Sequence, residues 1–277
     1  MKRHALTVGT VLAVFWAGAA CAREPRPTLA DVAYGPDPKQ QFDVYAPPDA
    51  HGAPVIVMVH GGGWRIGDKS NRGVVGAKGE HWLAKGYVFV SVNYRLLPHA
   101  DPLTQARDVA AALAMIENDA GGWGGDPGKV VLMGHSAGAH LVGLLSADPA
   151  LAAQAGAAPW AGTVVLDSAA MDVAAVMSRK HYDLYDDAFG ADTSYWKTVS
   201  PIAQLTAAAP PMLLVCSNVR PDKPCVQAHA FAQKAAPLGV RVQVSEQALS
   251  HREVNVSLGK PGAYTDTVDA FITALTR

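Results

Sequence analysis

Six short apolar runs, rich in β-branched and aliphatic residues, recur along the chain with longer segments of mixed polarity between them. Because the runs are mainly apolar, they predict strands buried on both faces of a sheet. Strands that alternate with helices predict an α/β fold, in which a mainly parallel central sheet is flanked by helices on both faces. The expected strands lie at 54–59, 87–92, 129–133, 162–166, 211–216 and 240–245, and the expected helices at about 74–85, 103–117, 137–146, 226–238 and 262–276.

Two segments depart from this alternation. A run at 42–45 predicts an additional, antiparallel edge strand. The stretch at about 171–209 contains several aromatic residues and scattered aspartates but few strand signals, and it is too long for a simple connection. Such excursions are often lids or binding loops, so this stretch predicts a small cap-like insertion. No Pro/Gly/Ser-rich linker marks a boundary, and residues 23–277 are therefore expected to form one domain.

The first 22 residues differ from the rest of the chain. A short basic start precedes an apolar stretch that ends at Trp16, and only small residues follow up to Ala22. This order predicts a secretory signal peptide cleaved after Ala22, and hence a secreted or periplasmic protein without a membrane span once the signal is removed. A lipoprotein cleaved before Cys21 and a membrane anchor are the alternatives. The abundance of alanine and glycine and the absence of a following basic cluster favour the cleaved signal.

Composition narrows the class of protein. Hydrophobic residues make up 49% of the chain and charged residues 17%, which suits a large buried core and argues against a disordered or coiled-coil chain. The 23 basic and 24 acidic side chains nearly cancel. This balance gives no electrostatic reason to expect nucleic acid or an anionic membrane surface as a partner. The chain is therefore expected to be a compact, near-neutral globular protein.

Cysteine usage agrees with export. The chain has three cysteines, and removal of the predicted signal leaves Cys216 and Cys225, nine positions apart. Such a pair in an exported protein predicts a disulfide, with two unrelated buried thiols as the alternative. The histidines and cysteines show no zinc-binding spacing such as C-x-x-C or H-E-x-x-H, so no metal or organic cofactor is expected.

A candidate nucleophile follows the strand expected at 129–133. Residues 134–138 read Gly-His-Ser-Ala-Gly, and the next segment predicts a helix. This G-x-S-x-G pattern places Ser136 on a tight strand-to-helix turn with its hydroxyl projecting into a cleft. Glycines are needed there because the turn is strained and neighbouring backbone passes too close for side chains. The alternative is a glycine-rich turn that contains an ordinary serine.

A second glycine-rich segment ends the strand expected at 54–59. Residues 60–64 read His-Gly-Gly-Gly-Trp, and consecutive glycines let backbone N–H groups turn inward. An acyl-transfer enzyme needs such donors where negative charge develops on a carbonyl oxygen, an effect of about 3–4 kcal/mol per donor. Gly62, Gly63 and Ala137 are the predicted oxyanion donors. A phosphate-binding loop would need the Lys-Ser/Thr of a P-loop, which is missing here; a plain flexible loop is the other alternative.

The candidate base is His251. In hydrolases of this kind the chain order is serine, acid, then histidine. Of the histidines well beyond Ser136 and its helix, His181 falls in the predicted cap and His229 within a predicted helix, whereas His251 follows the last expected strand in a loop. A lone loop histidine is usually a solvated surface group. Because the chain also contains the nucleophile motif and the glycine-rich oxyanion segment, His251 is the predicted base.

The acid of the triad must come from a carboxylate between Ser136 and His251. Asp222 lies in the loop after the strand expected at 211–216 and is the predicted acid, whose function is to hold the imidazole tautomer and stabilise its charged form. Asp167, directly after the strand expected at 162–166, is the alternative.

Together these segments resemble the serine esterases of the α/β-hydrolase superfamily that have an HGGG-type oxyanion loop, close to the hormone-sensitive-lipase-like and feruloyl-esterase-like branches. By this resemblance Ser136 is the nucleophile, Asp222 the acid and His251 the base. The segment after Cys216 is longer and less glycine-rich than the usual acid loop. The similar segments are Phe42–Pro47, His60–Trp64, Gly67–Lys69, Val92–Arg95, Gly125–Pro127, Gly134–Gly138 and His251.

The resemblance implies a serine hydrolase that cleaves carboxylic esters of small or aryl substrates through an acyl-enzyme intermediate. Trp64 and His135, with the aromatic residues of the cap, are expected to line a modest apolar pocket for a small-molecule ester; packing in the core is the alternative for the aromatic residues. The His-Gly-Gly-x-Trp form of the oxyanion loop is shared with kynurenine formamidase-like enzymes, so hydrolysis of an N-formyl amide is the alternative. A hydrolase-fold binding protein that has lost catalysis is a remote one, because Ser136 and His251 are both present.

Overall fold

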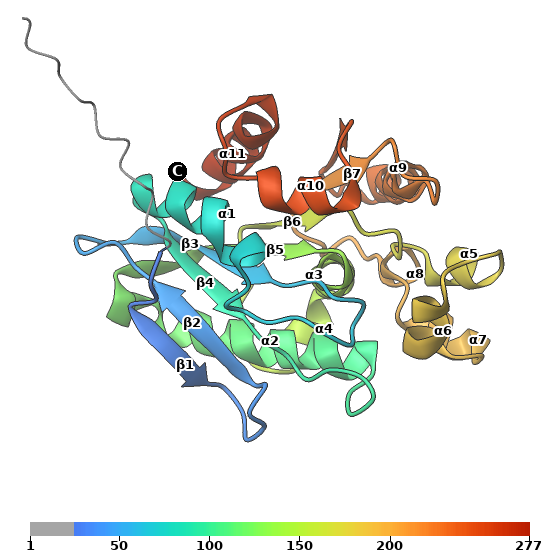
Figure 1. The fold of residues 1–277 in the computed structure, drawn as a ribbon, viewed down its shortest axis with the longest axis horizontal. Coiled ribbons are helices and arrows are strands. Elements are labelled where there is room, and N and C mark those ends of the chain that lie inside the picture. Colours follow the sequence, from blue (N-terminus) through green and yellow to red (C-terminus); the bar gives the residue numbers. More distant parts are fainter. Residues whose placement is uncertain (1–24) are drawn as a thin grey trace, which may run out of the picture.

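The computed structural model describes residues 25–277, which contain one eight-stranded sheet with helices on both faces (Figure 1). The predicted signal peptide, with Cys21, lies outside the described residues. The strand order is β1-β2-β4-β3-β5-β6-β7-β8. Strands β3 to β8 are parallel to one another, whereas β2 is antiparallel to both β1 and β4. The predicted α/β class is therefore confirmed. The strands are β1 (Leu29–Ala33), β2 (Gln41–Tyr45), β3 (Ala53–Val59), β4 (Val88–Val92), β5 (Gly125–His135), β6 (Gly162–Leu166), β7 (Met212–Ser217) and β8 (Val242–Gln247).

The central strands are apolar throughout because each of their faces packs against a separate layer of helices. In β3, Val55 and Val57 belong to one hydrophobic core, and Ile56 and Met58, which point to the opposite face, belong to the other. All four side chains are fully buried. Burial of an aliphatic side chain contributes about 1.5–3 kcal/mol, so both faces of the sheet stabilise the fold.

Helices α1, α10 and α11 cover one face of the sheet, and α2, α3 and α9 cover the other. Short helices α4, η1 and η2 complete the connections. The helices expected at 74–85, 103–117, 137–146, 226–238 and 262–276 correspond to α1, α2, α3, α9 with η2, and α11. The bounds are α1 (Arg72–Ala84), α2 (Pro102–Asp119), η1 (Ala120–Trp123), α3 (Ala137–Ala147), α4 (Pro149–Ala153), α9 (Pro224–Ala235), η2 (Ala236–Leu238), α10 (His251–Ser257) and α11 (Ala263–Thr276).

Both edges of the sheet differ from the sequence-based expectation. Strand β2 is antiparallel, as expected for 42–45, but β1 pairs outside it and forms the edge. Most β1 side chains are exposed, so the strand has no apolar run to reveal it. At the other edge, β8 has no fully buried residue, whereas its run predicted a central strand. Its valines alternate with polar residues, and Val242 and Val244 pack against the core on one face of the sheet.

Four short helices lie between β6 and β7, within the stretch where a cap-like insertion is expected. In Figure 1, α5, α6 and α7 lie at the far right of the view, and α8 lies between them and α3. Within residues 25–277, no helix has both the length and the apolar character needed to span a membrane. The four helices are α5 (Val173–Met177), α6 (Asp183–Phe189), α7 (Thr193–Thr198) and α8 (Pro201–Gln204).

Candidate active site

Ser136 lies on a sharp turn between β5 and α3. Its φ of +56° is a left-handed conformation that a residue with a side chain rarely adopts. The two flanking glycines make this turn possible: a Cβ on Gly134 would lie 2.4 Å from the Gly138 oxygen, and one on Gly138 would lie 2.3 Å from the Val59 oxygen. The Ser136 N–H donates to the oxygen of Leu166 at 3.0 Å, which ties the turn to the end of β6. The sequence therefore folds this serine into a tight turn in which its side chain is half-buried and lines a cavity.

His251 is the first residue of α10, where a loop is expected. Ser250 caps this helix: its hydroxyl accepts from the Glu253 N–H, and the Glu253 carboxylate accepts from the Ser250 N–H. Together the two bonds form a capping box. Serine three residues before glutamate is a sequence signal for such a box, so this helix could have been predicted from Ser250 and Glu253. The cap fixes the backbone from which the imidazole projects.

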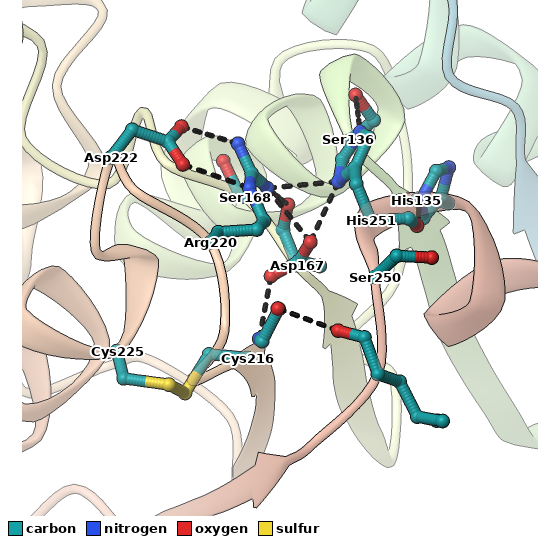
Figure 2. Close-up of polar contacts among 12 residues, drawn as sticks. His135, Ser136, Asp167, Ser168, Cys216, Arg220, Asp222, Cys225, Ser250 and His251 are labelled. Atoms are coloured by element: carbon teal, nitrogen blue, oxygen red, sulfur yellow. Dashed lines mark hydrogen bonds and ion pairs between the residues drawn. A yellow bond between two sulfur atoms is a disulfide. The ribbon is translucent and has the colours of Figure 1, made fainter.

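The side chains of Ser136, His251 and Asp167 form a continuous hydrogen-bonded chain (Figure 2). His251 Nε2 lies 2.9 Å from Ser136 Oγ, and His251 Nδ1 lies 2.6 Å from Asp167 Oδ2. Ser136 follows β5, Asp167 follows β6 and His251 follows β8. All three therefore lie at the carboxyl ends of parallel strands, where open α/β sheets have their ligand-binding crevice. The structure thus brings together the predicted nucleophile, the predicted base and the alternative acid.

Asp167 is fully buried and surrounded by donors. Its Oδ1 accepts from the Ser217 N–H at 2.7 Å, and its Oδ2 accepts from His251 and from Arg220 Nη1. Burial by itself would raise the pKa of this carboxyl, but the hydrogen bond from His251 and the positive charge of Arg220 outweigh it and hold the pKa below its usual value. The carboxylate is therefore kept ionised although it has no exposed surface.

The structure places Asp222, the predicted acid, on the far side of Arg220 from the imidazole. Both carboxylate oxygens of Asp222 accept hydrogen bonds from the Arg220 guanidinium, which lies between Asp222 and the Asp167–His251 pair. The reason is that the loop after β7 directs Arg220 toward His251, whereas Asp167 follows β6 directly. With a φ of +57°, the Asp167 backbone turns sharply at the end of the strand. Arg220 was not recognised from the sequence, and its place between two cysteines was the only signal.

The predicted oxyanion donors lie beside the serine. Gly62, Gly63 and Ala137 line the same cavity as Ser136. Ala137 opens α3, and the first N–H groups of a helix have no partner within it, so they are available to an oxygen atom. The glycine segment is held in a tight turn, because the Gly62 oxygen accepts from the backbone N–H of Ile66 at 3.0 Å. All three residues thus line the cavity at Ser136, and their role as oxyanion donors stays a prediction.

Trp64 also lines the cavity, but its indole is 3% exposed and belongs to the wall. It packs edge-on against Phe189 of α6, with the ring centres 4.9 Å apart, and lies beside Tyr185 of the same helix. Its Nε1–H donates to His140 Nδ1 at 3.3 Å, and His140 Nε2–H donates to the Val199 oxygen at 2.7 Å. Burial lowers the pKa of His140 to about 4, so this link between the oxyanion loop and the insertion is neutral.

His135, expected in the pocket, lies in the cavity wall against His251. The two ring centres are 4.6 Å apart, and His135 Nε2–H donates to the backbone oxygen of His251 at 3.0 Å. Burial, with the neighbouring His251, lowers the pKa of His135 to about 3. A neutral His135 therefore supports the backbone of His251 without adding charge to the site.

Two adjoining cavities lie at the carboxyl ends of the strands. The cavity at Ser136 has a volume of about 630 Å³. A neighbouring cavity of about 380 Å³ lies between the loop after β7 and the start of α6. The two share a wall of mainly apolar or aromatic character. Its residues are Ala169, Tyr182, Tyr185, Pro221 and Asp222.

A disulfide joins Cys216, in β7, to Cys225, in α9. The loop that it closes carries Arg220 and Asp222, and Figure 2 shows the bridge at the base of this loop. Among residues 25–277, no group of three or more His, Cys, Asp or Glu side chains is arranged to hold a metal ion.

Solved structures of esterases have the same fold. Esterase B from Lactobacillus Rhamnosis (HN001) superposes with a TM-score of 0.73 at 22% identity, covering 92% of this chain and 89% of that chain. The apo form of Thermogutta terrifontis esterase 2 gives a TM-score of 0.71 at 21% identity, covering 90% and 96%. At these identities the likeness concerns the fold, and it confirms the expected α/β-hydrolase architecture.

Curated relatives share sequence with parts of the chain. Esterase LipQ from Mycobacterium tuberculosis (strain ATCC 25618 / H37Rv) is 31% identical over 219 residues, or 73% of this chain and 51% of that protein. Isoprenylcysteine alpha-carbonyl methylesterase ICME from Arabidopsis thaliana is 34% identical over 112 residues, or 40% of this chain and 25% of that protein. The chain thus spans about half the length of LipQ and less of ICME. A family model described as BD-FAE matches residues 42–235, which is more than half of the chain, and the protein therefore belongs to the BD-FAE family.

Proposed function

We propose that this protein is a serine hydrolase of carboxylic esters, in which Ser136 is the nucleophile, His251 the base and Asp167 the acid. The observation that carries the proposal is the hydrogen-bonded chain from Ser136 Oγ through His251 to the buried Asp167 carboxylate. The esterase names of LipQ and ICME support the same reaction class. A structural serine would have no need of a base oriented in this way.

The first half of the reaction follows from the two ends of the imidazole. Nδ1 carries a hydrogen that it donates to Asp167, so Nε2 is free to take the Ser136 proton while Oγ bonds to the ester carbonyl carbon. The carbonyl oxygen becomes an oxyanion, which the N–H groups of the glycine loop and of Ala137 stabilise. His251 then gives its proton to the departing alcohol, and an acyl-serine remains.

The second half uses the same groups in the opposite direction. His251 removes a proton from water, whose oxygen attacks the acyl carbon, and then returns that proton to Ser136 Oγ as the acid leaves. Asp167 stabilises the imidazolium formed in each half. Because its pKa is held below the usual value, Asp167 keeps its negative charge throughout the working pH range.

The shape of the site favours small or aryl esters. The cavity of about 630 Å³ accepts the carbonyl end, and the adjoining cavity of about 380 Å³ offers an apolar wall with Tyr182 and Tyr185 for the remainder. Trp64 is already packed against Phe189 and shapes the wall without offering an open face. We assign helices α5 to α8 the role of a cap that forms one side of this site.

A substrate panel with a matched variant tests the function. The purified protein is assayed with p-nitrophenyl esters of increasing acyl length, with feruloyl and acetyl sugar esters, and with N-formylkynurenine. Ser136→Ala should remain folded, lose labelling by a fluorophosphonate, and lose activity by a factor of about 10⁶. Retained labelling of Ser136→Ala would exclude the assigned nucleophile. Hydrolysis of N-formylkynurenine alone would replace the ester function by a formamidase.

Export is a second proposal, supported by the basic, apolar and small-residue order before Ala22 and by the Cys216–Cys225 disulfide. Structural disulfides persist in oxidising compartments and are rare in the cytosol. N-terminal sequencing of the mature protein recovered from the periplasm or medium should begin after Ala22. A cytosolic protein with an intact first residue would exclude export.

A further inference from the structure

The side chain of Arg220 lies at the end of the imidazole that faces away from the serine. Its Nη1 is 2.8 Å from His251 Nδ1, 2.7 Å from Asp167 Oδ2 and 3.1 Å from the Asp167 backbone oxygen. Its Nε and Nη2 donate to the two carboxylate oxygens of Asp222. The Arg220 side chain is 14% exposed. The positive charge of Arg220 thus lies between the carboxylates of Asp167 and Asp222 and next to the imidazole of His251 (Figure 2).

Hydrogen-bond chemistry limits what Arg220 can do there. A ring nitrogen of neutral imidazole either donates one hydrogen or accepts one, and the guanidinium only donates. With Nε2 accepting from Ser136, Nδ1 carries the hydrogen and gives it to Asp167. Arg220 then cannot donate to Nδ1, and its Nη1 hydrogens go to the two Asp167 oxygens instead. Its effect on His251 is therefore electrostatic.

The sign of that effect follows from the charges. Asp167 stabilises the imidazolium, whereas the positive charge of Arg220 at a similar distance destabilises it. Asp222, on the far side of the guanidinium, weakens the field of Arg220. The guanidinium of Arg220 thus lies between the negative charges of Asp167 and Asp222. The protonation of His251 therefore depends on the position of this guanidinium.

Other titratable groups face His251 from the surrounding elements. His135, at the end of β5, is neutral because burial lowers its pKa to about 3. Lys78, in α1, donates to the backbone oxygen of Asn255 in α10, and burial lowers its pKa to about 7. Tyr264, in α11, has a pKa raised by burial and by the charge of Asp167. The remaining groups on α10 itself are Arg252 and Glu253, both exposed.

We propose that Arg220, anchored by Asp222 and by the disulfide-closed loop, is a positioning residue that holds Asp167 in place and whose charge opposes protonation of His251. This inference rests on the proposed function of Ser136, His251 and Asp167. Asp222 thereby gains a role different from the predicted one: it keeps Arg220 on Asp167 and prevents it from donating to Nδ1. An arginine that donated to Nδ1 would select the tautomer that cannot take the serine proton.

The test is the pH dependence of kcat/KM for a p-nitrophenyl ester, read as the midpoint of the acid limb. Arg220→Gln should move this midpoint up by about one pH unit, since a full charge at hydrogen-bond distance is removed from a mostly buried site. Asp222→Asn should move it down, by about half as much, because Arg220 loses its neutralising partner. Shifts in opposite directions from two neighbouring residues would not arise from a general loss of structure.

Two further variants separate charge from packing. Arg220→Lys keeps the charge but loses the planar, two-pronged pairing, so its midpoint should stay near that of the wild type while kcat falls. Lys223→Gln removes an exposed positive charge from the same loop and should leave the midpoint unchanged. A midpoint for Arg220→Gln equal to that of the wild type would overturn the proposal. So would equal shifts for Arg220→Gln and Arg220→Lys, or for Arg220→Gln and Lys223→Gln.

A readout without turnover keeps this test separate from the test of function. NMR titration of the His251 ring in the Ser136→Ala background should give the same order of midpoints, lowest for Asp222→Asn and highest for Arg220→Gln. If the wild type neither hydrolyses esters nor reacts with a fluorophosphonate, the proposed function fails, and the NMR order still decides on Arg220. If Arg220→Gln does not fold, the Asp222→Asn and Arg220→Lys midpoints decide. An unchanged midpoint for Asp222→Asn, or a raised midpoint for Arg220→Lys, then overturns the proposal.

Discussion

The end of β6 and the loop after β7 each carry a carboxylate toward the same site, and they hold it in different ways. Asp167 directly follows β6, and its backbone N–H donates to the Val215 oxygen in β7 at 2.7 Å. Asp222 lies further from its strand, in a loop closed by a disulfide, and its side chain is 18% exposed. The sheet therefore fixes Asp167 directly, whereas Asp222 depends on a loop and on one arginine.

This difference indicates that the carboxylates of Asp167 and Asp222 have different roles. The group that touches the imidazole is the one held by sheet hydrogen bonds, where an error of about 1 Å could cost around a hundredfold in rate. The group in the loop acts through Arg220 and tolerates more movement. Its effect should accordingly be smaller and of a different kind.

Exchange of each carboxylate for its amide gives the largest contrast. Asp167→Asn should reduce kcat by about 10⁴, because an amide in this position favours the wrong tautomer of His251. Asp222→Asn should reduce kcat near neutral pH by less than about tenfold, the equivalent of about 1.4 kcal/mol. Steady-state kinetics on both purified variants measures the ratio. A larger loss for Asp222→Asn would restore it as the acid.

Removal of the disulfide tests the loop alone. A double Cys216→Ser, Cys225→Ser variant should lose somewhat less than about 3 kcal/mol of stability, the chain-entropy value for a loop of about ten residues. Its kcat should fall because Arg220 and Asp222 lose their support, and this loss should not add to that of Asp222→Asn, since both act on Arg220. Urea denaturation and kcat of the single, double and triple variants provide the comparison. Full activity without the bridge would show that the loop holds its shape unaided.

The smallest expected effect is on stability at low pH. The pKa of Asp167 is lower in the folded protein than in the unfolded chain, so its ionised form stabilises the fold above the unfolded value of about 4. This contribution is lost as the pH falls through the lower, folded pKa. The free energy of unfolding of the wild type should thus exceed that of Asp167→Asn at pH 7, and the difference should shrink toward pH 3. A difference independent of pH would mean that Asp167 does not titrate in this way.

The sequence was informative where local chemistry determines structure. Apolar runs identified the central strands, and the glycines around Ser136 and Gly62 identified turns that side chains would block. The choice between Asp167 and Asp222 is a different problem, because both follow neighbouring strands. It depends on the left-handed turn at Asp167 and on the direction of the Arg220 side chain, which arise only when β6, β7 and α10 are assembled.

Two further elements escaped prediction for physical reasons. Strand β1 is mostly exposed and is recognised only through its pairing with β2, so its own residues carry little signal. Helix α10 has seven residues, too few to show a clear helical period, although its capping box was present in the sequence. Short elements of this kind owe their stability to their neighbours.

The packing of Trp64 makes the oxyanion loop optically observable. Its indole touches Phe189 and Tyr185 of α6 and donates to His140, so a displacement of α6 changes the polarity and hydrogen bonding around the ring. Indole emission responds to such changes, and the part contributed by Trp64 is the difference between the wild type and Trp64→Phe. Stopped-flow fluorescence during acylation would therefore follow the cap and the oxyanion loop together, in real time and without an attached label.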